Sequence, residues 1–146
     1  MTGVDRTCHV YRTFVEQLNK EKYAVPVLPY GNLWYCFLIN SLSPQFIETR
    51  PELHPCRFTV HLATHRFLLH DSFLIVNKPT LLSDDDLATP VGRLNSSCQQ
   101  KLYLAVDACE LLTERVRKAM LLHLHPRVMG IRRLELPQSS SRSMCE

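Results

Sequence analysis

The apolar pattern at the start of the chain predicts an amphipathic helix over residues 6–21. Val10, Phe14 and Leu18 recur every four residues there, with charged side chains between them. That spacing places the three side chains on one face of a helix. Asp5 stands where a helix N-cap is expected. We therefore expect the chain to begin with one helix that covers part of a core.

The pattern changes after this segment and predicts about four antiparallel strands. Residues 33–40 are apolar and aromatic on both faces, which is typical of a central strand. Residues 57–63 alternate between apolar and polar side chains, and residues 67–69 and 72–76 predict one or two further strands. Residues 23–28 are interrupted by Pro26, so we expect them at most at a sheet edge.

The last regular element is helical by its spacing. Between residues 97 and 125, apolar side chains recur every three or four positions for five turns, which favours one continuous helix. A rival interpretation makes Leu102–Val106 a strand and begins the helix after Asp107, where Asp107 and Glu110 would form a capping box. We favour the continuous helix because strand alternation is poor in this segment.

This order of elements predicts an α+β domain. Its parts are an N-terminal helix, an antiparallel sheet of about four strands, and a long C-terminal helix packed on one sheet face. The length of 146 residues fits one domain, which we place at residues 1–136, with a long polar loop at 79–96. The Ser-rich segment 137–146 predicts a disordered, flexible tail. With 45% hydrophobic residues, the chain is not wholly disordered.

The apolar runs and the cysteines predict a compartment. The longest apolar run, residues 33–39, is well short of the roughly 20 residues of a transmembrane helix, and no signal-peptide pattern is visible. We therefore predict no transmembrane segment and an intracellular location, cytoplasmic, nuclear or both. Disulfide scaffolds are short, secreted and poor in core, so reduced thiols are expected here, with Cys36 and Cys109 as small buried hydrophobes. The six cysteines are Cys8, Cys36, Cys56, Cys98, Cys109 and Cys145.

Cationic side chains gather near the C-terminus, although the net charge is only +3. Six of the 17 Lys and Arg residues fall within residues 115–133, which contain no Asp or Glu. They are Arg115, Arg117, Lys118, Arg127, Arg132 and Arg133. Such a patch suits phosphate backbones, although cations near a helix C-terminus also offset the helix dipole. Tyr30, in an expected turn, could add base stacking.

These features predict a non-enzymatic module that binds nucleic acid, with RNA favoured over DNA, or another polyanion. Compact chains with short basic tails also suit virus-encoded accessory proteins. The alternative is a protein-interaction or scaffold subunit, matrix-like and self-associating as a homo-oligomer. That alternative would use the two-sided apolar strand 33–40, the Pro-rich loop 41–55 and the acidic loop 83–86. The basic end could also make weak, salt-sensitive contact with a membrane surface.

Candidate chemistry is sparse. No GxGxxG, phosphate-loop or nucleophile-elbow pattern occurs, and four glycines leave little backbone for a phosphate cradle. We therefore predict no enzyme and no cofactor, with Cys56 beside a neighbouring histidine as the one arrangement worth testing. We predict no metal site. The weak candidates are His54, Cys56, His61 and His65, whose ligand types suit zinc but whose spacing matches no common finger.

Overall fold

One antiparallel sheet of six strands dominates the structure, a computed structural model that describes residues 4–130. The strand order is β4-β5-β3-β2-β1-β6. The strands are β1 (His9–Val15), β2 (Lys20–Tyr30), β3 (Leu33–Asn40), β4 (Arg57–Val60), β5 (Ser72–Ser83) and β6 (Pro90–Arg93). The helices are α1 (Gln45–Glu48), α2 (Ser96–Ala108) and α3 (Glu114–His125), with the short helical segments η1 (Glu16–Leu18), η2 (Pro51–Cys56) and η3 (Pro126–Gly130).

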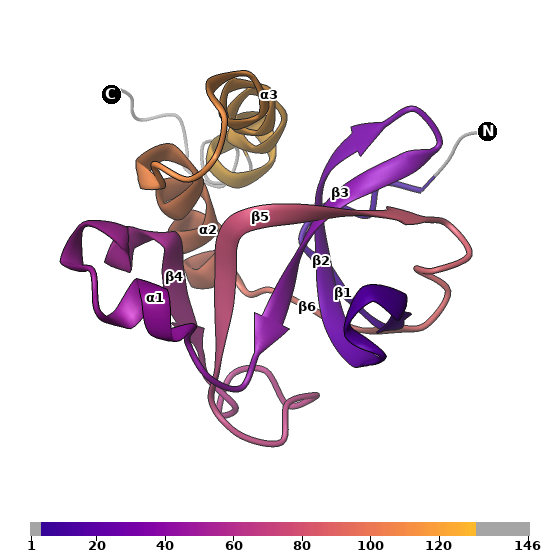
Figure 1. Cartoon of the computed structure of the whole chain (residues 1–146). Helices are drawn as coiled ribbons and strands as arrows, with labels where there is room; N and C mark the ends of the chain where they lie inside the picture. The colour runs from indigo at the N-terminus through magenta and orange to yellow at the C-terminus, as the bar shows by residue number, and fades with distance from the viewer. Residues whose placement is uncertain (1–3, 131–146) are drawn as a thin grey trace, which may run out of the picture.

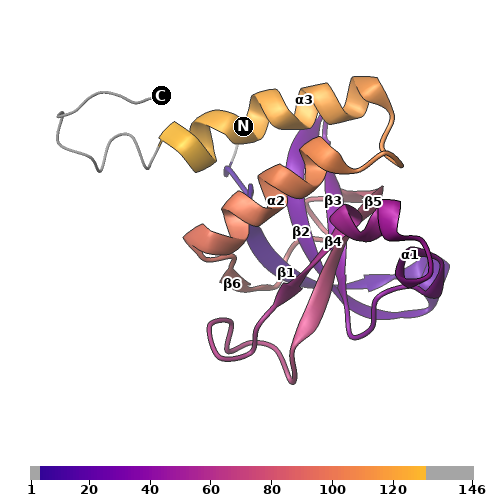
Figure 2. The ribbon, with the colours of Figure 1, turned by 90° about the vertical axis from the view of Figure 1, so that its left-hand side faces the viewer.

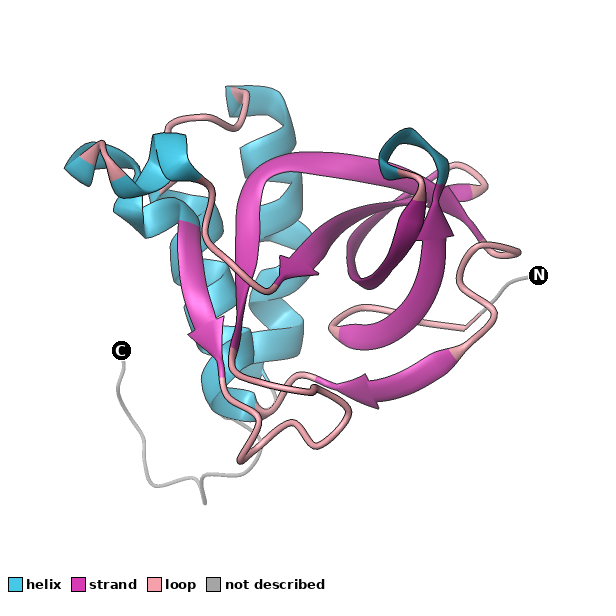
Figure 3. Ribbon diagram, turned by 60° about the horizontal axis from the view of Figure 1, so that its bottom comes forward, coloured by secondary structure: helices cyan, strands magenta, loops and turns pink. Residues whose placement is uncertain are grey.

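The sheet is strongly curled, so that β5 arches over the inner strands and the whole forms a half-barrel (Figures 1 and 3). Register shifts lie between Pro26 and Leu28 in β2 and between Cys36 and Leu38 in β3. Bulges of this kind bend a strand and increase its twist, which explains the curl. Helices α2 and α3 lie side by side against one side of the sheet (Figure 2).

Apolar side chains fill both sides of the central strands. The main core lies between the sheet and the helices, and includes Phe37, Leu74, Leu102 and Leu124, all fully buried. A smaller cluster lies on the other side of the sheet. It consists of Tyr11, Ala24, Trp34, Cys36, Leu82 and Leu87. Because both sides are covered, β3 is a continuous apolar run, and its predicted position as a central strand is confirmed.

The predicted N-terminal helix is wrong. The segment forms β1, the single turn η1 and the start of β2, which pair in antiparallel register from Tyr11↔Ala24 to Val15↔Lys20. Two of the three residues that suggested a helix, Phe14 and Leu18, stay 50% and 45% exposed. The buried side chains of β1 include Tyr11 and Val15, which fit a strand with period two.

The predicted four-stranded sheet is also wrong, because two segments assigned to a helix and a loop are strands. The expected loop 79–96 contains the end of β5 and the whole of β6. Strand β2, expected at an edge because of Pro26, lies between β3 and β1. Pro26 is tolerated there because it sits beside the register shift, where a ladder hydrogen bond is already missing.

The C-terminal helical region is two helices instead of one. Asn95 caps α2 by accepting a hydrogen bond from the Cys98 amide at 2.9 Å. The chain is extended at Cys109, and Thr113 then caps α3 by accepting from the Val116 amide at 3.4 Å. The segment 102–106 is helical, so the rival strand interpretation is wrong as well.

A disulfide between Cys56 and Cys109 explains why the chain turns at the end of α2. The two Cα atoms are 4.8 Å apart, and the bond joins η2 to the residue that follows α2. The prediction of reduced thiols is therefore wrong for this pair. Cys8, Cys36 and Cys98 are buried free thiols, and Cys145 lies outside the described residues, as does the predicted tail 137–146. Within residues 4–130, no helix is long and apolar enough to cross a bilayer.

Candidate anion-binding pocket

The predicted basic patch is largely paired with carboxylates at the start of α3. Arg117 forms ion pairs with Asp107 and Glu114, and Lys118 lies 3.6 Å from Glu114. Arg115 is exposed and has no ion pair among residues 4–130. These carboxylates offset much of the field that would attract a phosphate.

Arg127 lies at the other end of α3 and holds the N-terminal segment. Its Nε donates to Asp5 at 2.9 Å, and its Nη1 donates to the His123 carbonyl at 2.7 Å. Twelve residues at 1.5 Å rise place Arg127 about 18 Å along the axis from Arg115, so the two cannot act at one point. Arg132 and Arg133 lie outside the described residues.

The Asp5 carboxylate determines which atoms of Thr7 and His123 donate and which accept hydrogen bonds beside Arg127. Burial alone would raise the pKa of Asp5, but hydrogen bonds from Thr7 and Arg127 lower it to about 2. The carboxylate therefore only accepts, and the Thr7 hydroxyl donates to it at 2.7 Å. The Thr7 oxygen then accepts from His123 Nε2 at 2.8 Å, so His123 is not placed to take the Thr7 proton.

Tyr30 is 59% exposed at the end of β2 and its ring centroid lies 5.4 Å from that of Tyr35. The turn that follows Tyr30 lines an open groove of about 780 Å³, together with Arg127 and His123. The structure thus brings the Tyr30 turn and Arg127 to one groove, while Arg115 and its neighbours stay apart from it.

The four weak metal candidates do not converge. Cys56 is in the disulfide, and His54 Nε2 lies 3.1 Å from the Glu48 carbonyl oxygen. His61 is exposed beside Asp71, whereas His65 is buried. Among residues 4–130, no group of three or more His, Cys, Asp or Glu side chains is arranged to hold a metal.

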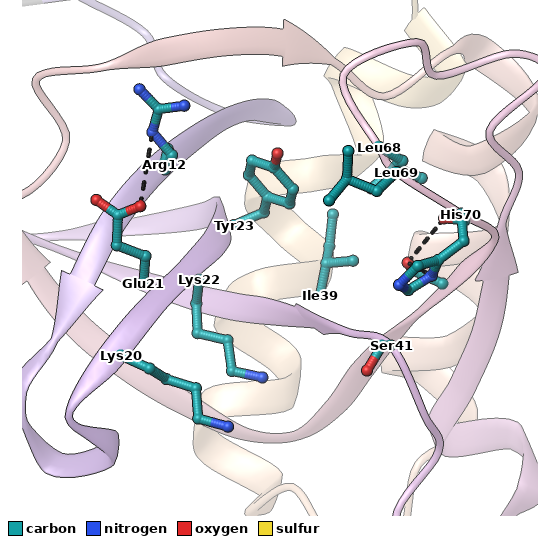
Figure 4. A pocket seen from close by; sticks show the side chains of 11 residues that line it. Arg12, Lys20, Glu21, Lys22, Tyr23, Ile39, Ser41, Leu68, Leu69 and His70 are labelled. Atoms are coloured by element: carbon teal, nitrogen blue, oxygen red, sulfur yellow. Dashed lines mark hydrogen bonds and ion pairs between the residues drawn. The ribbon is translucent and has the colours of Figure 1, made fainter.

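A second cluster of cations surrounds a pocket that the sequence did not indicate. The pocket has a volume of about 350 Å³ and lies between the β1–β2 ribbon and the loop that connects β4 to β5 (Figure 4). We call it the cationic pocket. Its lining residues are Arg12, Lys20, Glu21, Lys22, Tyr23, Ile39, Ser41, Leu68, Leu69, His70 and Ser72.

The paired ends of β1 and β2 form one side of the cationic pocket and contribute side chains from both faces of the ribbon. Arg12 is the register partner of Tyr23, and Glu21 is the partner of Phe14. Lys20 and Lys22 are two residues apart in β2, so they project from one face of the strand, and Glu21 and Tyr23 project from the other. Figure 4 shows the two lysine side chains running side by side.

The opposite wall is the β4–β5 loop, which hydrogen bonds hold against the sheet. The Tyr23 hydroxyl donates to the Phe67 carbonyl at 3.0 Å, and the two rings meet edge to face at 5.4 Å. His65 Nε2 accepts from the Asn95 amide at 3.1 Å and ties the loop to the start of α2. Residues 68–70 are thereby held across the pocket from the two lysines.

Positive charge in the cationic pocket is poorly balanced. Glu21 is its one carboxylate, and its contact with Arg12 is long, at 4.0 Å between exposed side chains. Lys22 Nζ donates to the Asn40 side-chain oxygen at 2.6 Å, a neutral partner. Burial and the neighbouring Lys20 charge lower the pKa of Lys22. An anion placed between these cations would relieve that repulsion.

The alternation of Lys20 and Lys22 is the sequence signal that could have indicated this site. It has the period of a strand, but the predicted helix over residues 6–21 treats Arg12 and Lys20 only as charged side chains between the apolar ones. The residues across the pocket are about 50 positions further along the chain, so local patterns could not connect them. No protein-family model matches the chain, and no curated protein sequence matches it either.

Proposed function

We propose that the protein is a non-enzymatic binding module for nucleic acid and that the cationic pocket contacts its phosphates. The observation that carries the proposal is the grouping of Arg12, Lys20 and Lys22 around one pocket with a single carboxylate, Glu21. Cations so placed bind a phosphate backbone and release its counterions. RNA is favoured over DNA because RNA offers single-stranded loops with unstacked bases.

An exposed aromatic side chain beside Arg12 supports the same function. Phe14 is two residues from Arg12 in β1, so it projects from the same strand face, and half of its surface is exposed. Cations and exposed rings together are the usual elements of single-strand binding without sequence preference. Helix α3 makes a smaller contribution in this proposal, because carboxylates already partner Arg117, Lys118 and Arg127.

The test is the salt dependence of binding to a labelled single-stranded RNA, measured by fluorescence anisotropy. The double variant Lys20→Gln/Lys22→Gln should lower the slope of log K against log salt by about 1.4, at about 0.7 per lost phosphate contact. The matched control is Lys78→Gln/Lys101→Gln, which removes the same charge from exposed positions in β5 and α2.

The control should keep a slope close to that of the native protein. If the two double variants weaken binding equally, net charge alone attracts the RNA and the site assignment fails. If the native protein does not bind RNA at low salt, the function fails as well.

A second candidate function, a self-associating scaffold subunit, rests on a different surface from the one the sequence indicated. Strand 33–40 lies inside the sheet and is covered, so it offers no docking face. Leu104 in α2 and Leu122 in α3 are exposed instead. A scaffold predicts an oligomer that survives about 0.5 M salt in light scattering and that Leu122→Glu dissociates. A monomer at every concentration would exclude it.

Two further predictions from the sequence stay proposals. One is that the chain is a virus-encoded accessory protein. The other is an intracellular location, against which the disulfide counts, because disulfides persist mainly in oxidising compartments. The redox state of Cys56 and Cys109 in cells tests the second.

A further inference from the structure

The cationic pocket has an apolar interior that phosphate contact alone does not require. Ile39 and Leu68 line it and are each only 4% exposed, and the half-buried Tyr23 ring stands beside them. In Figure 4 these three side chains lie behind the hollow, and the lysines approach it from one side. Small-molecule sites combine an apolar lining with a few polar groups in this way, at volumes of about 300–1,000 Å³.

The apolar wall is formed before any ligand arrives. The Tyr23 ring is held at its hydroxyl by the Phe67 carbonyl and on one side by the Phe67 ring. Gly92 in β6 brings its backbone against the Phe67 ring, since a Cβ at Gly92 would lie 2.7 Å from Phe67 Cδ2. A wall supported in this way loses little conformational entropy when a ligand binds.

The geometry points to a single unstacked nucleotide as the occupant of the cationic pocket. We infer that its phosphate lies at Lys20 and Lys22 and that its base lies against Tyr23 and Leu68. This inference rests on the proposed function and adds that one base of the bound strand enters the pocket. The volume of about 350 Å³ lies within the range of small-molecule sites and is large enough for one nucleotide.

The inference separates single strands from duplexes. In a duplex the bases are stacked and paired, so a phosphate can reach the lysines but no base can enter the pocket. A base held against an aromatic and apolar wall is usually worth a factor of about ten in affinity. We therefore expect a single-stranded 12-mer RNA to bind about tenfold tighter than a hairpin duplex of the same charge.

The test fills the pocket without removing a cation. Ser41 is exposed and lines the pocket, so Ser41→Trp places a bulky ring inside it. This variant should bind the single strand about tenfold more weakly and the duplex as before. The matched control is Ser97→Trp, at an exposed position in α2, which should bind both as the native protein does.

Competition provides a second measurement that needs no variant. A nucleoside 5′-monophosphate should displace the single strand at about a tenfold lower concentration than inorganic phosphate at equal ionic strength. Equal displacement by the two competitors would overturn the inference, because only the phosphate would then be recognised. Unchanged single-strand affinity in Ser41→Trp would overturn it as well.

These outcomes are distinct from failure of the proposed function. If single strand and duplex bind equally and both depend on Lys20 and Lys22, the cationic pocket binds nucleic acid but takes no base. If neither binds, or if the lysines have no effect, the proposed function itself fails and the inference fails with it.

Discussion

Removal of the Cys56–Cys109 disulfide should destabilise the protein by about 4 kcal/mol. The two residues are 53 positions apart, so the bond closes a long loop in the unfolded chain. With the loop-entropy relation, in which the lost entropy is about 2.1 plus 1.5R ln n in cal/mol/K, n = 53 corresponds to about 4 kcal/mol at 25 °C. Both sulfurs are buried against the main core, and the variant Cys56→Ala/Cys109→Ala removes the cross-link without adding a polar group.

Urea unfolding followed by the fluorescence of Trp34 measures this loss. Trp34 is the single tryptophan and it is buried in the smaller core, so its emission reports global unfolding. With a urea slope of about 2 kcal/mol/M, the midpoint should fall by about 2 M. Cys98→Ala is the control, because it removes a buried thiol but leaves the cross-link in place.

The number of reactive thiols tests whether the Cys56–Cys109 disulfide forms in solution. Of the six cysteines, two are in the disulfide, so no more than four should react with an alkylating agent in urea without a reductant. All six should react after reduction. If six react without reductant, the bond is absent in solution. If the double variant unfolds at the native midpoint, the entropic reasoning is wrong.

Two other predictions concern the loop that closes the cationic pocket. Burial lowers the pKa of His65. Its Nε2 accepts a hydrogen bond from the Asn95 amide, and a protonated Nε2 would instead point its own N–H at the Asn95 N–H. The stability from this bond is present above the ordinary histidine pKa of about 6.5 and is lost as pH falls through the lowered value. Urea unfolding at pH 8 and pH 5 should show a smaller pH effect for His65→Gln, and an unchanged effect would contradict this role. Gly92→Ala should cost about 1–3 kcal/mol in a thermal melt, because its Cβ would clash with the partly buried Phe67 ring. A native melting temperature would show that the ring moves aside freely.

The wrong prediction at the N-terminus has a specific cause. Val10, Phe14 and Leu18 fit a helical spacing, but β1 also contains Thr13 and Val15, whose branched side chains favour a strand. This short segment fits both the helical spacing and the alternation of a strand, so the local pattern does not distinguish a helix from a strand. Backbone pairing of β1 with β2 on one side and β6 on the other decides it.

The break in the C-terminal helical region has a similar origin. The apolar spacing continues through residues 109–113, so it predicts helix there. Cys109 leaves the helical conformation where it bonds to Cys56, which comes from a distant part of the chain. A single sequence does not show which of six cysteines will pair, because pairing depends on Cα atoms that folding brings together.

The sequence by itself determined the α+β class, the antiparallel sheet, the central place of strand 33–40 and the helical nature of residues 97–108. These features depend on local propensity and on the burial of continuous apolar runs, both of which are present in the residue order. Tertiary structure alone decided the number of strands, the disulfide and the cationic pocket. Each of these depends on contacts between segments far apart in the chain, such as those of Lys20 and Leu68. The residue order within one segment does not show which distant segment it will contact.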